Sequence, residues 1–221
     1  MTTQVRIERL GAQAWVPETG DLDALAAAAE HCEGCELFAP ATQVVFGCGA
    51  ENARCVLVGE QPGDQEDRAG EPFVGPAGRV LHRALAEAGI RPGSVWTTNA
   101  VKHFRFTERG KRRLHKTPDA GHVHACRPWL AAELDRLRPE LIVVLGATAA
   151  RALLGPAFRV TQERGLLLPW PERAAPGVVS VQWPAQVLAT LHPSAVLRAE
   201  DRDAAYAGLV ADLTVAAQAL S

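Results

Sequence analysis

The stretch LIVVLG, residues 141–146, is an apolar run of six residues that closes with a glycine. A short run of this kind, rich in β-branched residues, is typical of a strand buried on both faces of a parallel sheet. Three other runs share this character: CVLVG (residues 55–59), VWTTNAV (95–101) and VLATLHP (187–193). We therefore expect these four runs to form the strands of one central sheet.

Helical patterns alternate with these strands. Apolar spacing and caps predict helices over residues 21–30, 79–88, 122–137, 147–154 and 203–220. Strands alternating with helices imply right-handed crossovers and a parallel sheet covered on both faces. The expected fold class is α/β, a three-layer αβα sandwich with a central four-stranded parallel sheet in a single domain, 1–221. Residues 156–184 are poorly periodic, and we expect a surface hairpin there.

Composition narrows the classes of function. The net charge of −2 excludes a protein that binds polyanions with its whole surface, yet residues 102–116 hold seven Lys or Arg and one acid, Glu108. No run of eighteen apolar residues and no signal peptide are visible, so we expect a cytoplasmic protein without membrane contact. We also expect a monomer.

Polar residues follow the predicted strands at their carboxyl ends, where open α/β sheets bind ligands. The loop GEQPGDQED after the first strand carries Glu60 and Asp64, and LHPS after the last carries His192. Two carboxylates would repel a phosphate, so this loop is a poor phosphate-binding site. Carboxylates are better suited to stabilising a positive charge in a reaction or to positioning a water molecule. Amides of the turn at Ser194, and the side chain of Arg198, could hold phosphates.

The pair Cys32 and Cys35 has metal-ligand spacing, but two thiolates do not complete a metal site. The remaining ligands could come from Cys48, Cys126 or histidines, and the pair could also be a chance occurrence. Cys55 lies in a predicted buried strand, where packing is its expected role.

Two motifs, GEQPGDQEDRAGEPFVGPAGRVL and LHPSAVLR, resemble the uracil-DNA glycosylase superfamily, and more narrowly its iron–sulfur branch, family 4. The resemblance implies cleavage of the N-glycosidic bond of deoxyuridine in DNA, preferentially single-stranded because a base must leave the stack to react. It implies that Glu60 is the acidic residue of the first motif and that His192 stabilises the departing uracil anion. It assigns uracil binding to four residues: Gln61 through its amide at O2, Asp64, Phe73 by stacking and Asn99 at the Watson–Crick edge.

The same resemblance implies a [4Fe–4S] cluster. Its ligands would be Cys32, Cys35, His103 and Cys126, with His103 standing directly after NAVK where family 4 has a cysteine. Histidine replaces cysteine in some clusters. A three-cysteine cluster with a free fourth position is the alternative.

The stretch KRRLH, residues 111–115, departs from ordinary family 4 sequences and resembles the UdgX subgroup. There the loop histidine, here His115, attacks C1′ of the deoxyribose after uracil leaves and forms a covalent protein–DNA adduct. A positioned imidazole can capture the sugar cation faster than water does. The expected DNA-binding residues are Lys111, Arg112, Arg113, Ser194 and Arg198. Two alternatives are a glycosylase that turns over, with His115 on a phosphate, and a non-catalytic binding module.

Overall fold

A mixed sheet runs through the middle of the protein. The structure is a computed structural model that describes residues 9–170, 179 and 181–221. Within them the sheet has six strands in the order β1-β3-β2-β6-β8-β7. The four inner strands are parallel, as expected: β3 (Trp96–Asn99), β2 (Cys55–Gly59), β6 (Leu141–Leu145) and β8 (Gln186–Thr190). The edges are the short antiparallel strands β1 (Cys48–Gly49) and β7 (Leu167–Pro169).

Alternate residues of the inner strands pack into two separate hydrophobic cores, one on each face of the sheet. Ile142 and Val144 of β6 face one apolar cluster, whereas Val143 and Leu145 face the other. Successive side chains of a strand point to opposite faces, so a strand covered on both sides is apolar at every position. This is why the run LIVVL carries no polar residue and is fully buried.

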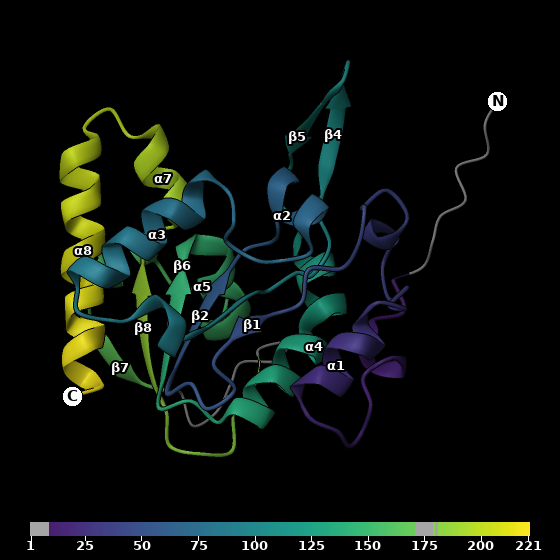
Figure 1. Cartoon of the computed structure of the whole chain (residues 1–221), viewed down its shortest axis with the longest axis horizontal. Helices are drawn as coiled ribbons and strands as arrows, with labels where there is room; N and C mark the ends of the chain where they lie inside the picture. The colour runs from purple at the N-terminus through teal and green to yellow at the C-terminus, as the bar shows by residue number, and fades with distance from the viewer. Residues whose placement is uncertain (1–8, 171–178, 180) are drawn as a thin grey trace.

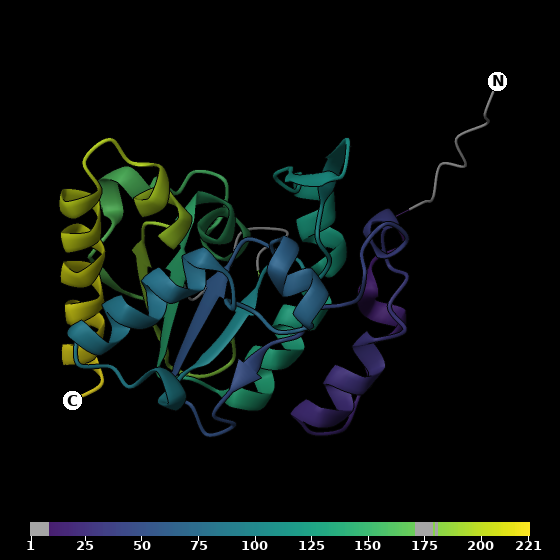
Figure 2. The same cartoon turned by 45° about the horizontal axis from the view of Figure 1, so that its top comes forward.

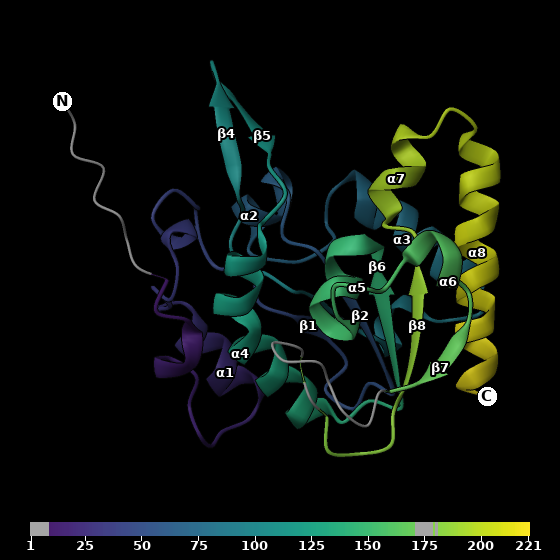
Figure 3. The same cartoon turned by 180° about the vertical axis from the view of Figure 1, so that it is seen from behind.

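Helices cover both faces of the sheet and make the three layers (Figures 1 and 3). One face carries α3 (Pro76–Glu87), α7 (Pro193–Arg198) and α8 (Arg202–Ala219), which contact one another. The other carries α1 (Leu22–Ala29), α4 (Ala120–Leu137) and α5 (Gly146–Leu154). Asp21 caps α1 by accepting a hydrogen bond from the amide of Ala24 at 2.9 Å, as expected of a helix start.

The region 102–116 folds into a hairpin instead of a loop. Strands β4 (Phe106–Arg109) and β5 (Arg112–His115) pair antiparallel through a turn at Gly110, whose φ of 61° suits glycine. Figures 1 and 2 show the hairpin standing clear of the central sheet, across from α7 and α8. Its strands are largely exposed, and therefore they lack the apolar alternation that would have indicated them.

Shorter elements also differ from the expectation. Helix α2 (Asp64–Ala69) lies within the loop after β2, and α7 follows His192 directly. Residues 156–184 contain α6 (Val160–Glu163) and the edge strand β7. Residues 171–178 and 180, where part of the expected surface hairpin falls, lie outside the described residues. None of the described helices is both long and apolar enough to span a bilayer.

Candidate active site

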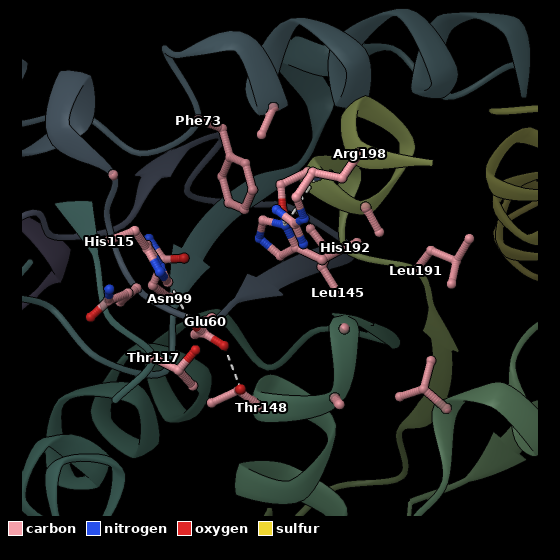
Figure 4. Close-up of a pocket in the computed structure, with 18 of the residues that line it drawn as sticks. Glu60, Phe73, Asn99, His115, Thr117, Leu145, Thr148, Leu191, His192 and Arg198 are labelled. Carbon is pink, nitrogen blue, oxygen red and sulfur yellow. Dashed lines mark hydrogen bonds and ion pairs between the residues drawn. The ribbon is translucent and has the colours of Figure 1, made fainter. Parts of the chain in front are cut away.

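A cavity of about 730 Å³ lies at the carboxyl ends of the inner strands. Each strand contributes to it: Glu60 follows β2, Asn99 ends β3, Gly146 follows β6 and His192 follows β8. The hairpin adds His115 (Figure 4). This is the crevice in which open α/β sheets bind their ligands.

Phe73 and Asn99 form the buried wall of the cavity. Phe73 has a φ of 58°, rare for a residue with a side chain, and its ring is packed to 5% exposure. Asn99 is 3% exposed, and it lines the cavity at the end of β3. A carboxamide offers one acceptor and two donors, which match N3–H and O4 of a uracil edge. The pair can therefore stack and read one flat base.

His192 is held as a neutral imidazole with a fixed tautomer. Its Nδ1 lies 2.8 Å from Oγ of Ser194 and 3.2 Å from the backbone nitrogen of the same residue. Because a backbone N–H can only donate, Nδ1 is the acceptor. Burial lowers the pKa of His192 from 6.5 to about 4, although the Glu60 carboxylate raises it in part. The proton of the neutral ring is therefore on Nε2, where it can be donated to an anion forming in the cavity.

Glu60 and His115 meet across the cavity. Oε1 of Glu60 lies 3.2 Å from Nε2 of His115, and Oε2 accepts a hydrogen bond from the hydroxyl of Thr148. Burial favours a higher pKa for the Glu60 carboxyl, but the hydrogen bonds from His115 and Thr148 outweigh it and lower the pKa. The carboxylate is ionised at neutral pH and can accept a proton from the imidazole.

Side chains beneath the hairpin fix its base. The Gln61 side chain donates to the carbonyl oxygens of Arg105 at 3.1 Å and Lys116 at 3.2 Å, and it accepts the Arg105 amide at 3.0 Å. The side chain of Gln61 therefore hydrogen-bonds to the base of the hairpin. Its backbone amide stays available for the expected contact with uracil. Asp64 is not among the residues that line the cavity, because its carboxylate pairs with Arg113 and Arg68. Its place in uracil binding stays a prediction, and in this structure the carboxylate contacts the hairpin through Arg113.

Comparison with known proteins agrees with this arrangement. The family model of the Uracil DNA glycosylase superfamily matches residues 46–214, which include every strand of the sheet and the hairpin. The chain belongs to the uracil-DNA glycosylase superfamily. It is 35% identical over 170 residues to a "Type-4 uracil-DNA glycosylase" of Thermotoga maritima, covering 76% of this chain and 79% of the relative. It is 34% identical over 178 residues to a protein of the same name from Pyrobaculum aerophilum, covering 80% and 85%.

The basic residues of this superfamily member divide into two groups. Lys111 and Arg112 are exposed at the turn of the hairpin, whereas Arg198 and Ser194, both of α7, line the cavity. Arg113 is different, because its side chain is 12% exposed and its guanidinium pairs with two aspartates. Of the five residues expected to bind DNA, Arg113 is the one whose side chain forms ion pairs with aspartates of the protein, and its DNA contact stays a prediction.

The four residues expected to hold the cluster, Cys32, Cys35, His103 and Cys126, are each buried. Cys32, Cys35 and Cys126 belong to one core, and the amide of Lys102 donates to the sulfur of Cys126 at 3.2 Å. Burial raises the pKa of Cys126 to about 12, although the charge and the backbone N–H of Lys102 oppose this rise. Burial lowers the pKa of His103 to about 4, which leaves a neutral imidazole.

Three of these four residues are cysteines, the usual ligands of iron–sulfur clusters. In the described part of the chain, no three His, Cys, Asp or Glu side chains converge closely enough to hold one metal ion. A four-iron cubane is larger than one ion and takes its ligands from corners that lie farther apart. An N–H donor directed at a ligand sulfur is also typical of cluster sites. Cys55, by contrast, is 1% exposed in β2, where it packs as expected.

Sequence reasoning missed two residues of the site. Thr148 lies after β6, at the same sheet edge as the other site residues. Its position just after a predicted strand could have identified it as a candidate site residue. Glu66 of α2 accepts hydrogen bonds from the amides of Gly63 at 3.1 Å and Gly75 at 2.8 Å, and so it joins the two halves of the first motif.

Proposed function

We propose that this chain excises uracil from DNA and that His115 then bonds to C1′ of the resulting abasic site. The observation that carries the proposal is the place of His115 in the cavity wall, 3.2 Å from Glu60, together with Phe73, Asn99 and His192. A uracil stacked on Phe73 and read by Asn99 would turn its sugar toward the open side of the cavity, where the hairpin lies.

Cleavage would begin when the N-glycosidic bond breaks and its electron pair leaves with uracil. The Nε2–H of neutral His192 would stabilise the negative charge that develops on the base. Glu60, ionised in the same cavity, would stabilise the positive charge on the sugar. The chain thus supplies a donor for the leaving anion and a carboxylate for the remaining cation.

Capture would follow from the position of His115. The lone pair of one ring nitrogen would form the bond to C1′, and the proton on the other ring nitrogen would pass to Glu60. Holding the nucleophile beside the cation gives it an advantage over water that reaches effective molarities of about 10⁵–10⁸ M in favourable cases. The product is neutral imidazole bonded to C1′, with uracil released.

The decisive experiment exposes the protein to an oligonucleotide that carries one uracil. We expect a protein–DNA band that survives boiling in SDS and an intact mass equal to protein plus oligonucleotide less uracil. His115→Ser should abolish the band while uracil is still released, leaving an abasic product. A variant lacking His115 that still becomes cross-linked would overturn the assignment of the nucleophile.

A conventional turnover glycosylase is the second candidate. It is favoured by one observation, that the His115 side chain is 47% exposed on a basic hairpin, where it could contact a phosphate. In that case the wild-type protein would release many equivalents of uracil, with no adduct in the intact mass spectrum.

Single-stranded DNA is the proposed preferred partner, bound through the exposed basic residues Lys111, Arg112 and Arg198. Extruding a base from a duplex costs a few kcal/mol of stacking and pairing, which a single strand avoids. We expect faster excision from the single strand than from the matching duplex. Equal rates on the two substrates would contradict the preference.

We also propose a [4Fe–4S] cluster held by Cys32, Cys35, His103 and Cys126. When bound, the cluster would tie the N-terminal segment to the hairpin base and α4. Purified protein should contain about four irons per chain and absorb visible light, as expected for four-iron clusters. His103→Ala should lower the iron content, while Cys48→Ala, at a thiol outside the set, should not.

A further inference from the structure

The hydroxyl of Thr148 holds one oxygen of Glu60. Thr148 is the third residue of α5, which begins directly where β6 ends. Its Oγ1 donates a hydrogen bond to Oε2 of Glu60, while Oε1 of the same carboxylate faces Nε2 of His115 at 3.2 Å. Figure 4 shows the three side chains in a row, with Glu60 between the other two. Each carboxylate oxygen thus has its own partner.

A carboxylate without an anchor would not keep this orientation. The last torsion of a glutamate is broad, so its oxygens exchange places readily. Threonine is branched at Cβ and has few rotamers in a helix, which makes its hydroxyl a fixed donor. Glu60 also lies at the amino end of α5, where the helix dipole favours a negative charge. Thr148 therefore fixes the direction of the Glu60 carboxylate.

This anchor is independent of the hairpin. Strands β2 and β6 are neighbours, and the contact between Glu60 and Thr148 joins the segments that follow them. Helix α5 packs mainly on β2, β6 and α4. The contact that holds Oε2 of Glu60 is therefore made by a residue outside the hairpin.

We infer that Thr148 is a positioning residue that decides whether the sugar cation is captured by His115 or by water. The inference rests on the proposed function of His115. Both outcomes need a base: capture by His115 delivers the imidazole proton to Glu60, and capture by water delivers a water proton to the same carboxylate. With Oε2 held by Thr148, Oε1 is directed at the imidazole. Without the hydroxyl, the carboxylate can turn to a water molecule, and an abasic site is released.

The test compares Thr148→Val, which keeps the shape and loses the hydroxyl, with Thr148→Ser, which keeps the hydroxyl. Each protein is mixed in excess with a single-stranded oligonucleotide that carries one uracil. Uracil released and adduct formed are measured in the same samples. We expect the ratio of adduct to uracil to fall roughly tenfold or more in Thr148→Val, as when one hydrogen bond to a charged group is lost. Thr148→Ser should keep the wild-type ratio.

The outcomes separate this inference from the function on which it rests. If the wild-type protein forms the adduct and Thr148→Val keeps the same ratio, the inference fails and the covalent function stands. A parallel loss of uracil release and adduct in Thr148→Val also leaves the ratio unchanged, and it assigns Thr148 a purely structural role. If the wild-type protein releases uracil without an adduct, both fail. Failure of Thr148→Ser to restore the ratio, at equal unfolding free energy, would also overturn the inference.

Discussion

Arg113 donates a hydrogen bond to Oδ2 of Asp67 at 2.6 Å, which fastens the hairpin to helix α2. Asp67 is fully buried, and it also accepts the backbone amide of Thr42 at 3.1 Å. On β5, Arg113 lies two residues before His115, and residues two apart in a strand share one face. The ion pair that holds the hairpin therefore also directs His115 toward Glu60.

Removing this pair should separate adduct formation from uracil release. Arg113→Ala frees the hairpin and leaves the Asp67 carboxylate buried without its charged partner, which should cost about 1–3 kcal/mol of stability. We expect much less adduct in gels run after boiling in SDS, with uracil release retained because Phe73, Asn99 and His192 do not depend on the hairpin. Wild-type adduct levels in this variant would refute the role of the pair.

Arg112 is the matched control for Arg113, because it is the adjacent residue and its side chain is exposed. Arg112→Ala should leave the position of His115 unchanged and weaken binding to the DNA backbone. The slope of log affinity against log salt should fall by about 0.7 for the loss of one phosphate contact on a single strand. An unchanged slope would place Arg112 outside the DNA interface.

The contribution of His192 to the unfolding free energy should depend on pH in a way that an exposed histidine's does not. Its folded pKa of about 4 lies below the unfolded value of 6.5, so the unfolded chain binds more protons between these two values. The stability that His192 contributes is therefore complete above pH 6.5 and is lost as the pH falls toward 4. Urea unfolding of wild type and His192→Asn across this window should show the difference. Uracil release by wild type should show no break near pH 6.5 that is due to His192.

Gly59 should be needed for base recognition because no side chain fits at the end of β2. A Cβ there would overlap Oδ1 of Asn99 and lie 2.7 Å from Cζ of Phe73. Gly59→Ala should therefore displace both base-contacting residues, slow uracil release strongly and destabilise the fold by about 1–3 kcal/mol. Gly93→Ala is the control, since a Cβ at Gly93 meets nothing within 4 Å. Equal activity of the two variants would contradict the recognition role.

Elements buried in the core could be predicted from the sequence, whereas short edge strands and exposed strands could not. The inner strands were predictable because burial on both faces makes runs such as CVLVG apolar throughout. The edge strands β1 and β7 have two and three residues, too few to show a period. The hairpin is exposed, so its strands carry polar residues on both faces and were read as a loop.

Contacts between residues far apart in the sequence could not be predicted from local patterns either. Nothing local marks Arg113 as the basic residue that is paired, because Asp64 and Asp67 come from a helix more than forty residues earlier. Thr148 has an ordinary helical sequence around it, and only the strand order reveals that it faces Glu60. By contrast, Glu60, Asn99 and His192 follow recognisable strands, and so their convergence could be expected from the parallel topology.

The buried pair of Lys102 and Glu133 provides the sharpest test of how the core supports the site. Both side chains are fully buried, and the Lys102 ammonium donates to Glu133, to Oγ1 of Thr98 at 2.5 Å and to the carbonyl oxygen of Asn99 at 3.1 Å. Lys102→Met should cost about 3–5 kcal/mol, because it leaves the Glu133 carboxylate buried without its cation. It should also slow uracil release, since the backbone of Asn99 loses its anchor.

Removing both charges should recover part of that stability, because an apolar pair leaves no unpaired ion in the core. Lys102→Met combined with Glu133→Met should therefore unfold at higher urea concentration than Lys102→Met alone. Recovery will be incomplete, since Glu133 also accepts hydrogen bonds from the amide of Gly47 at 3.1 Å and from the indole of Trp96 at 3.3 Å. A double variant no more stable than Lys102→Met would mean that the unpaired charge of Glu133 is not what destabilises the single variant.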